Sequence, residues 1–358
     1  MLRFNCDYSE GAHPKVLEKL IETNMEQTAG YGMDPYCAKA AQLIKSKCGR
    51  DSIDVHFLMG GTQANLTVIT AALRPHQGVI SAHTGHINTH ETGAIEANGH
   101  KVLALPAVDG KLTAQAVQAC YEAHVNDETR EHIVQPKLVY ISNPTEIGTI
   151  YSRAELTGIS EVCRKNDLFL YVDGARLGYA LCAEDNDLDL PALARLCDAF
   201  YIGGTKIGAL FGEAVVLCSD TIRRDFRYIM KQKGGMLAKG RLLGVQFAAL
   251  FEEDLYFEMA SHANKMALLI KAAFKRNGYG FLVESTTNQQ FPVIPDKILT
   301  KLKEKFEYSF WEKVNTDTSA VRFCTSWATE PDAVEQLIEE IDKYGPVAWK
   351  GCPHEQNI

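Results

Sequence analysis

The sequence predicts an α/β protein in which helices cover both faces of a mostly parallel sheet, followed by a smaller α+β domain. Three observations lead to this fold class. Short apolar strands alternate with amphipathic helices up to about residue 217. Glycines and polar residues directly follow several of these strands, where parallel sheets usually carry their ligand sites. From about residue 218 long helices dominate, and 358 residues are too many for one small core.

The first part of the chain reads as a series of apolar strands separated by helices. Pro14 lies near the start of the first helix, and Ser152 and Glu155 form a capping-box pattern. Thr62 is the expected N-cap of the helix that follows the first strand. We expect strands at 56–59, 79–80, 101–105, 137–142, 168–172, 199–202 and 214–217, and helices at 14–26, 36–48, 66–73, 86–98, 114–123, 152–166 and 190–196.

The second part of the chain has a different pattern. Long helices are expected at 221–232, 242–251 and 254–277, strands at 290–294 and 321–324, and a last helix from about residue 329. We therefore predict a large domain over residues 1–250, including the N-terminal segment, and a small α+β domain over residues 251–358.

Composition and charge exclude several classes of protein. The formal net charge of -8 argues against a general binder of nucleic acid or of anionic membranes. The N-terminus has no apolar signal-peptide region, and no apolar run approaches the length of a membrane span. The ten cysteines occur singly and never as Cys-x-x-Cys, which argues against a zinc ribbon or a redox motif. We expect reduced cysteines and a cytoplasmic protein.

Lys206 is the first candidate for a functional residue. It follows the apolar strand 199–202 and stands among glycines, where a solvated charge is unusual. A desolvated lysine with a lowered pKa can attack a carbonyl and form a Schiff base. The alternative is a lysine at a strand end whose amine simply reaches solvent.

Asp173 is the second candidate. It ends the apolar strand 168–172, and Lys206 follows about one βαβ unit later, so both residues should reach the same edge of the sheet. A buried carboxylate needs a partner, and the protonated ring nitrogen of pyridoxal phosphate (PLP) is one. Alternatively, Asp173 pairs with Arg176 or caps the next helix.

Two further segments follow strands. Gly60, Gly61 and Thr62 begin a helix, where free backbone N–H groups suit a phosphate, although a plain helix start is equally consistent with them. His83, His86 and His90 follow strand 79–80, and one of them could stack on a cofactor ring or act as a base. Metal binding is the competing interpretation, but no third ligand is apparent and we predict no metal site.

These motifs together resemble the threonine aldolase (beta-eliminating lyase) branch of the PLP-dependent fold-type I enzymes. The similarity extends from Asp7 to the last helix. It is carried by residues 29–35, 60–65, 85–93, 173–176, 204–206 and 321–326.

The resemblance implies a role for each motif. Lys206 would form the Schiff base with PLP, and Asp173 would bind the pyridine nitrogen. Gly61 and Thr62 would hold the phosphate. His86 would stack on the ring and handle the proton of the substrate hydroxyl. Arg176 and Arg322 would lie near the cofactor and the substrate carboxylate, which an arginine can bind in a bidentate pair. Tyr31 would complete a site across a subunit boundary.

The chain departs from the family pattern in two places. Family members often carry a serine near the N-terminus that helps to hold the substrate carboxylate. This chain has Cys6 and Asp7 in that segment, so Ser9 is the candidate. A basic residue of the neighbouring subunit often meets the phosphate, and the candidates here are Lys231, Lys233 and Lys239.

The resemblance implies a carbon–carbon lyase that cleaves β-hydroxy-α-amino acids, such as L-threonine or L-allo-threonine, to glycine and an aldehyde. The alternatives keep PLP and change the bond broken, as in a β-eliminating lyase or an aminotransferase. We expect a small amino acid as substrate, no nucleic-acid or membrane partner, and a homodimer or homotetramer with shared active sites.

Overall fold

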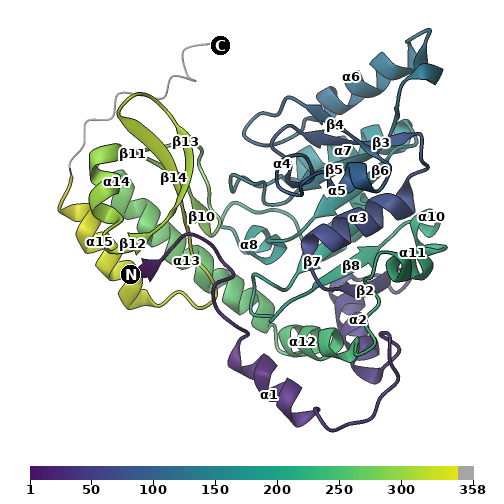
Figure 1. Ribbon diagram of the computed structural model, residues 1–358, viewed down its shortest axis with the longest axis horizontal. Helices are drawn as coiled ribbons and strands as arrows, with labels where there is room; N and C mark the ends of the chain where they lie inside the picture. Colours follow the sequence, from purple (N-terminus) through teal and green to yellow (C-terminus); the bar gives the residue numbers. More distant parts are fainter. Residues whose placement is uncertain (346–358) are drawn as a thin grey trace.

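The computed structural model describes residues 1–345, and its main element is a sheet of seven strands (Figure 1). The strand order is β2-β8-β7-β6-β5-β3-β4. The strands are β2 (Asp54–Leu58), β3 (Gln77–Ala82), β4 (Lys101–Leu105), β5 (Gln135–Ser142), β6 (Phe169–Asp173), β7 (Ala199–Gly203) and β8 (Glu213–Leu217).

The sheet is mostly parallel, as predicted, and β8 is the antiparallel strand. It pairs antiparallel with both β7 and β2, whereas β7-β6, β6-β5, β5-β3 and β3-β4 are parallel pairs. The loop of residues 204–212 joins β7 to β8. It is shorter than the roughly dozen residues that a parallel crossover needs, so β8 must return beside β7. The carboxyl ends of the parallel strands and the start of β8 therefore share one edge.

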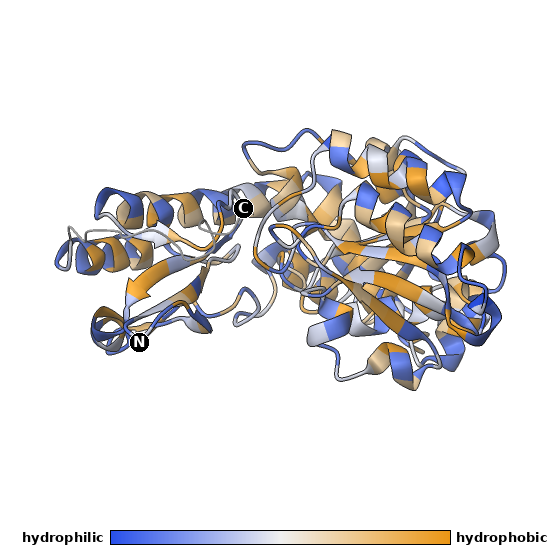
Figure 2. Ribbon diagram, turned by 90° about the horizontal axis from the view of Figure 1, so that it is seen from above, coloured by the Kyte–Doolittle hydropathy of each residue, from blue (hydrophilic) through white to orange (hydrophobic). Residues whose placement is uncertain are grey.

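Helices cover both faces of this sheet, and each strand sends alternate side chains into two separate cores. In β5, Val139 and Ile141 join one core, while Leu138 and Tyr140 join the other. Figure 2 shows the apolar strands inside polar outer helix surfaces. The helices of this part are α1 (Pro14–Glu22), α2 (Pro35–Cys48), α3 (Gly61–Ala72), α4 (His86–Thr89), α5 (Ala94–Ala97), α6 (Ala114–Val125), α7 (Arg153–Lys165), α8 (Leu177–Leu181), α9 (Leu190–Leu196), α10 (Asp220–Arg223), α11 (Phe226–Gln232) and α12 (Arg241–Glu252), with the short 3₁₀ helix η1 (Arg130–His132).

A smaller α+β part follows, built on an antiparallel sheet of order β10-β14-β11-β9, with β13 paired to β14. Its core forms around Phe274, Leu302, Phe323 and Leu337. The elements are α13 (Leu255–Arg276), β9 (Gly280–Phe281), β10 (Gln289–Gln290), β11 (Pro292–Pro295), α14 (Asp296–Leu302), β12 (Phe306–Glu307), β13 (Ser309–Lys313), β14 (Thr318–Cys324) and α15 (Pro331–Asp342).

The N-terminal segment differs from the predicted domain division. Strand β1 (Leu2–Arg3) pairs with β12, and Phe4 is buried in the core of the smaller part. The chain therefore begins on the small domain and crosses to the large one, which the prediction for residues 1–250 did not foresee. The rest of the division stays a prediction, and residues 346–358 of the predicted small domain lie outside the described residues.

Two local predictions were wrong. The single helix expected over 86–98 is two short helices, α4 and α5, because Thr92 and Gly93 adopt positive φ angles of 52° and 70° between them. Thr62 is not an N-cap. Helix α3 begins at Gly61, and its N-cap residue Gly60 has no side chain to bond the first turn. Within residues 1–345, no helix is both long enough and apolar enough to span a membrane.

Candidate active site

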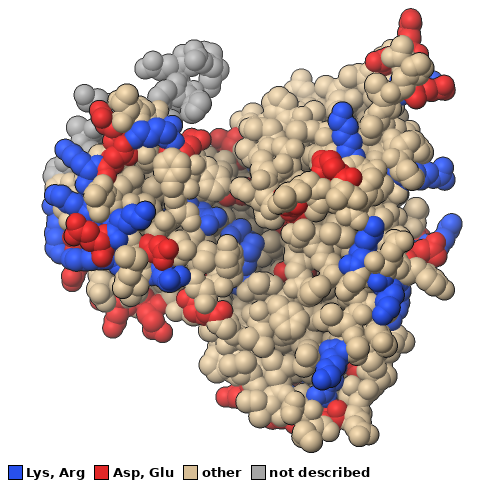
Figure 3. All heavy atoms as spheres, in the orientation of Figure 1, with Lys and Arg blue, Asp and Glu red and all other residues tan. Residues whose placement is uncertain are grey.

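A cavity of about 330 Å³ opens at the carboxyl edge of the large sheet. The face in Figure 3 is hollowed between the two lobes, and basic side chains lie within the hollow. The cavity brings together six predicted site residues, which are Gly61, Thr62, His86, Asp173, Arg176 and Lys206. They come from segments that follow β2, β3, β6 and β7, so the shared strand edge gathers them as the sequence predicted.

Lys206 lies in the loop between β7 and β8, and its backbone carbonyl accepts a hydrogen bond of 2.6 Å from the Tyr179 hydroxyl. Burial lowers the pKa of the Lys206 amine, and the nearby Arg176 charge lowers it further. A lysine with a lowered pKa carries a neutral, nucleophilic amine more often than a solvated one. Lys206 is thus suited to attack a carbonyl.

Asp173 ends β6 and is 4% exposed. Its carboxylate accepts hydrogen bonds from Tyr140 Oη at 2.6 Å, Tyr201 Oη at 2.5 Å, Asn65 Nδ2 at 3.0 Å and the Ala175 backbone N–H at 3.0 Å. Burial would raise the pKa of Asp173, but the His86 charge and the tyrosine bonds lower it. The group is therefore held as an anion facing the cavity.

Both alternative interpretations of Asp173 were wrong. Arg176 does not pair with it, because the Arg176 guanidinium binds Asp7. Asp173 does not cap a helix either, since α8 begins at Leu177 with Arg176 as its N-cap residue.

His86 has its imidazole fixed by a second carboxylate. Nδ1 lies 2.8 Å from Glu91 Oε1, and that same oxygen accepts a hydrogen bond of 2.7 Å from Asn65. Burial lowers the pKa of His86, but the hydrogen bond to Glu91 and the charges of Asp173 and Glu91 together outweigh this effect, and the pKa is raised. With Nδ1 directed at Glu91, Nε2 is the nitrogen available for proton transfer.

The predicted phosphate turn is packed closely against the Asp173 network. A Cβ added at Gly61 would lie 2.9 Å from Tyr201 Oη, the hydroxyl that binds Asp173. Since α3 begins at Gly61, the N–H groups of its first turn have no partners within the helix. Glycine is needed here, and the helix start offers N–H groups at the cavity wall.

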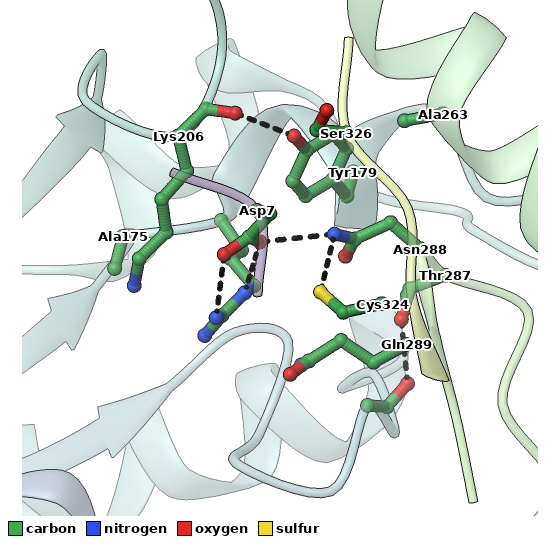
Figure 4. Close-up of polar contacts among 12 residues, drawn as sticks. Asp7, Ala175, Tyr179, Lys206, Ala263, Thr287, Asn288, Gln289, Cys324 and Ser326 are labelled. Carbon is green, nitrogen blue, oxygen red and sulfur yellow. Dashed lines mark hydrogen bonds and ion pairs between the residues drawn. The ribbon is translucent and has the colours of Figure 1, made fainter. Parts of the chain in front are cut away.

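Arg176 lines the cavity, but two of its guanidinium nitrogens already bind another residue. Its Nε and Nη2 donate to the Asp7 carboxylate at 2.6 and 2.9 Å, and Asn288 donates to the same carboxylate at 2.9 Å. Figure 4 shows Asp7 between the Lys206 side chain and Asn288. Nη1 remains as the group of Arg176 that could meet a substrate carboxylate.

The structure does not bring Ser9, Tyr31 and Arg322 into this cavity. Ser9 is exposed, with Oγ 3.2 Å from Cys6 Sγ. Arg322 lies on β14, where Nη2 donates to the Asn5 carbonyl at 2.8 Å.

Tyr31 lines a separate cavity of about 380 Å³ beside α2 and α11. There Lys231 Nζ lies 4.6 Å from the centroid of its ring. Another of the predicted phosphate lysines, Lys233, accepts a hydrogen bond from Gln63 through its carbonyl, which places its backbone near the start of α3. The choice among Lys231, Lys233 and Lys239 stays open.

Glu91, Glu146 and Glu213 surround the site, and the sequence reasoning missed all three. Glu146 Oε1 accepts from Ser142 Oγ at 2.6 Å and from the His86 backbone N–H at 2.9 Å. Glu213 is the first residue of β8 and lies at the cavity wall. A carboxylate at the start of an apolar strand is the same signal that identified Asp173, so Glu213 could have been found. In the described part of the chain, no group of three or more His, Cys, Asp or Glu residues is placed to hold a metal ion.

Comparison with known proteins places the chain in a family. Residues 6–296 match the beta-eliminating lyase family. The chain is 29% identical over 348 residues to the low specificity L-threonine aldolase of Pseudomonas aeruginosa, covering 95% of this chain and 96% of that protein. It is 30% identical over 344 residues to the low specificity L-threonine aldolase of Pseudomonas sp. strain NCIMB 10558, with 95% and 96% covered.

The solved structures agree with the sequence relatives. The Leishmania major threonine aldolase superposes with a TM-score of 0.93 at 45% identity, covering 96% of this chain and 99% of that one. The aspartate aminotransferase of Thermus thermophilus superposes with a TM-score of 0.70 at 14% identity, covering 96% and 91%, which shows the fold-type I architecture alone. The chain belongs to the beta-eliminating lyase family.

Proposed function

We propose that this protein cleaves L-threonine or L-allo-threonine to glycine and acetaldehyde, with PLP as its cofactor. One observation carries the proposal. Lys206, Asp173 and His86 line one cavity with the start of α3, in a chain 45% identical to a threonine aldolase over 96% of its length. A fold-level likeness alone would not choose this reaction, because the same fold carries aminotransferases.

The residues of the cavity fit PLP. An amine with a lowered pKa and a buried anionic carboxylate share the cavity, and these suit the aldehyde carbon and the ring nitrogen of the cofactor. The start of α3 supplies N–H groups for a phosphate, and Gly61 leaves the space that a Cβ would fill. Lys206, Asp173, Gly61 and Thr62 would therefore hold the cofactor.

The chain's own residues position the bond to be broken. PLP, when bound, supplies the electron sink for cleavage of the Cα–Cβ bond. Asp173 would pair with the protonated ring nitrogen of the cofactor, and Arg176 Nη1 would bind the substrate carboxylate. His86 Nε2 takes the proton of the β-hydroxyl, while Glu91 keeps the opposite nitrogen, Nδ1, protonated and the ring fixed.

Product analysis tests the proposal. Purified protein is incubated with PLP and L-threonine, and glycine, acetaldehyde, pyruvate, ammonia and keto acids are measured. Aldol cleavage gives equal amounts of glycine and acetaldehyde. A β-eliminating lyase would release ammonia and a keto acid instead, and an aminotransferase would require an amino acceptor. Either of these results would refute the proposed reaction.

A substrate series then defines the specificity. Steady-state rates for L-threonine, L-allo-threonine, their D-forms, L-phenylserine and L-serine separate selectivity at Cα from selectivity at Cβ. We expect both L-isomers of threonine to be cleaved. A higher rate for the D-forms would contradict the proposed stereochemistry at Cα.

We also propose a homodimer or homotetramer in which Tyr31 of one subunit reaches the cavity of another. Tyr31 is 46% exposed, and Met33, which lines the same cavity, is 67% exposed, so an apolar surface lies at these residues. Light scattering during gel filtration measures the assembly, and a monomer that is fully active would contradict shared sites. The nine described cysteines are free thiols, which supports our proposal of a cytoplasmic protein.

A further inference from the structure

Glu146 is an acid of the cavity that the proposed reaction leaves without a role. It lies in the loop that follows β5, whereas His86 begins α4 in the segment that follows β3. Both residues line the cavity, and they meet there because β3 and β5 are neighbours in the sheet. Glu146 Oε1 accepts a hydrogen bond of 2.9 Å from the His86 backbone N–H and one of 2.6 Å from Ser142 Oγ. The acid is therefore bonded to the main chain of the proposed base.

The bond from His86 supplies what the start of α4 lacks. An N–H group in the first turn of a helix has no partner within that helix. The N-cap residue of α4 is Gly85, which has no side chain to accept such a bond. The Glu146 carboxyl group therefore takes the place of an N-cap side chain, although it comes from a different loop.

Helix α4 depends on such contacts because it is only four residues long. A single turn fixes several backbone dihedral angles for very few hydrogen bonds, so it is not stable by itself. Glu91 bonds the ring of His86 through Nδ1 at 2.8 Å, and this contact determines which ring nitrogen is available. Glu146 bonds the backbone of the same residue and so fixes the point from which the ring extends.

The loop that carries Glu146 is itself held in place. The Gly148 N–H donates to the Thr145 carbonyl at 2.9 Å, which closes a turn around Glu146. From the small domain, Ser285 Oγ and Thr287 Oγ1 donate to the Gly148 carbonyl at 2.9 and 3.2 Å. Both of these side chains are buried. Glu146 is therefore an acceptor on a fixed support, which is what a positioning residue requires.

The acceptor does not have to be charged. Burial raises the pKa of Glu146, although the hydrogen bonds from Ser142 and from the His86 backbone oppose this effect. A carboxylate oxygen and the carbonyl oxygen of a neutral acid both accept hydrogen bonds. The contact with His86 therefore depends on the reach of the side chain rather than on its charge.

We propose that Glu146 is a positioning residue, which holds His86 Nε2 at the substrate hydroxyl by accepting the His86 backbone N–H. Glu146 exchanges no proton with the substrate and acts through His86 alone. The use of Nε2 as a base rests on the proposed function. Two variants separate reach from charge. Glu146→Asp keeps the charge but is one methylene group too short, whereas Glu146→Gln keeps the reach and an acceptor oxygen.

Backbone amide exchange measures the contact without catalysis. Full-length protein without added substrate is transferred to D₂O, and mass spectrometry with electron-transfer fragmentation follows the His86 amide. We expect this amide to exchange about tenfold faster in Glu146→Asp than in the wild type, because the bond that protects it is lost. In Glu146→Gln the rate should stay within about threefold of the wild type. An unchanged rate in folded Glu146→Asp would overturn the proposal.

A ratio of two rates measures the effect on the action of His86. Cleavage of L-threonine needs the β-hydroxyl proton to be removed, whereas exchange of the α-proton of glycine in D₂O involves no hydroxyl group. In Glu146→Asp the ratio of cleavage to exchange should fall about 10- to 100-fold, the loss expected when an acid–base group is displaced. A merely structural defect lowers both rates together. An unchanged ratio in Glu146→Asp, or an equal fall in Glu146→Gln, would overturn the proposal.

Glu155→Asp is the matched control. Glu155 Oε2 accepts the Ser152 backbone N–H at 2.8 Å at the start of α7, and Glu155 does not line the cavity. Shortening this side chain weakens a helix cap of the same kind, so the ratio of cleavage to exchange should stay within about threefold of the wild type. A fall as large as that in Glu146→Asp would also overturn the proposal.

A further variant covers the case in which Glu146→Asp does not fold. Glu146→Ala removes the acceptor without leaving an unpaired charge in the cavity, and it should give the same two results. Either result missing from folded Glu146→Ala would overturn the proposal. Wild-type protein that releases no glycine from L-threonine would refute the proposed reaction, while the exchange rates of the His86 amide would still decide whether Glu146 holds the histidine.

Discussion

Two regions that are stabilised in different ways meet at Arg176, which lines the cavity. The sheet edge, which carries Gly61, His86, Asp173 and Lys206, is built from segments that directly follow parallel strands. The domain seam is built from the N-terminal segment, α8 and the small-domain sheet, and its members are Asp7, Arg176, Asn288 and Arg322.

The two regions use their charges differently. At the sheet edge the pKa of Lys206 is lowered and the pKa of His86 is raised, and such shifts are typical of catalytic groups. At the seam, Asp7 and Arg176 satisfy each other in a buried bidentate pair. We infer that damage to the edge affects the reaction first, and that damage to the seam affects folding first.

The largest effect is expected at the sheet edge, from Lys206→Ala. Loss of the amine should lower aldol cleavage by about a thousandfold or more, because a residue that acts at the reacting bond is not replaced by its neighbours. The free energy of unfolding should change little, since Lys206 is only partly buried. Initial rates of glycine release and the absorption band of bound PLP measure the effect. Unaltered cleavage with an unaltered band would remove Lys206 from the mechanism.

The next largest effect is a loss of stability at the seam, and it is expected from Asp7→Asn. The change leaves the Arg176 guanidinium, whose side chain is 14% exposed, without its buried anion. Losing one partner of a buried pair costs about 3–5 kcal/mol, so urea denaturation should show a large fall in the free energy of unfolding. Glu253→Gln breaks the pair with Lys15, in which the side chains are 74% and 55% exposed, and should change stability by less than about 1 kcal/mol.

The same pair gives a pH dependence whose sign is fixed. Burial would raise the pKa of Asp7, but Arg176, together with the Lys206 charge and the Asn288 hydrogen bond, outweighs burial and lowers the pKa from 3.8 to about 2. The pair therefore stabilises the fold fully above pH 4 or so and loses this contribution as pH falls through about 2. Asp7→Asn should lack this acid-dependent component. Parallel acid denaturation curves for the variant and the wild type would contradict the assignment.

The same two regions differ in how far the sequence predicts them. The sheet edge follows from a local rule, since apolar strands identify the ends where Asp173 and Lys206 lie. The seam has no such local pattern, because Asp7 and Asn288 meet only when the N-terminal segment crosses between the domains. Local backbone geometry also escaped prediction. The positive φ of Thr92 breaks the expected histidine helix, although that residue type rarely adopts such a conformation.

The seam also bears on two predicted substrate residues that do not line the cavity. Ser9 and Arg322 were assigned by family likeness, and neither lines the cavity. Arg322 binds the carbonyl of Asn5 and lies 3.3 Å from Gln289, so its position depends on contacts between distant segments. Lys206 and Asp173, in contrast, were predicted from the residues around them and do line one cavity.

A smaller effect tests whether neighbouring groups at the sheet edge determine the pKa of His86. Glu91→Gln removes one of the two anions that together outweigh burial and raise the pKa of His86; the other is Asp173. Because His86 must be deprotonated to act as a base, the activity of the wild type rises as pH passes through this raised pKa. In the variant the acid limb of the rate profile should move about one unit to lower pH. An acid limb that stays in place would mean that a different group is the base.

The smallest expected effect concerns the fit between the helix start and the Asp173 network. In Gly61→Ala the new Cβ would lie 2.9 Å from Tyr201 Oη, so the hydroxyl that bonds Asp173 must move. We expect PLP to bind several-fold more weakly, which corresponds to about 1 kcal/mol. Gly11→Ala adds a methyl group where no atom lies within 4 Å and should leave this affinity unchanged. Tyr201→Phe removes the hydroxyl that is displaced, so the double variant should lose less affinity than the sum of the single changes. Additive losses would show that Gly61 acts independently of Tyr201 and that the helix start and the Asp173 network are not coupled.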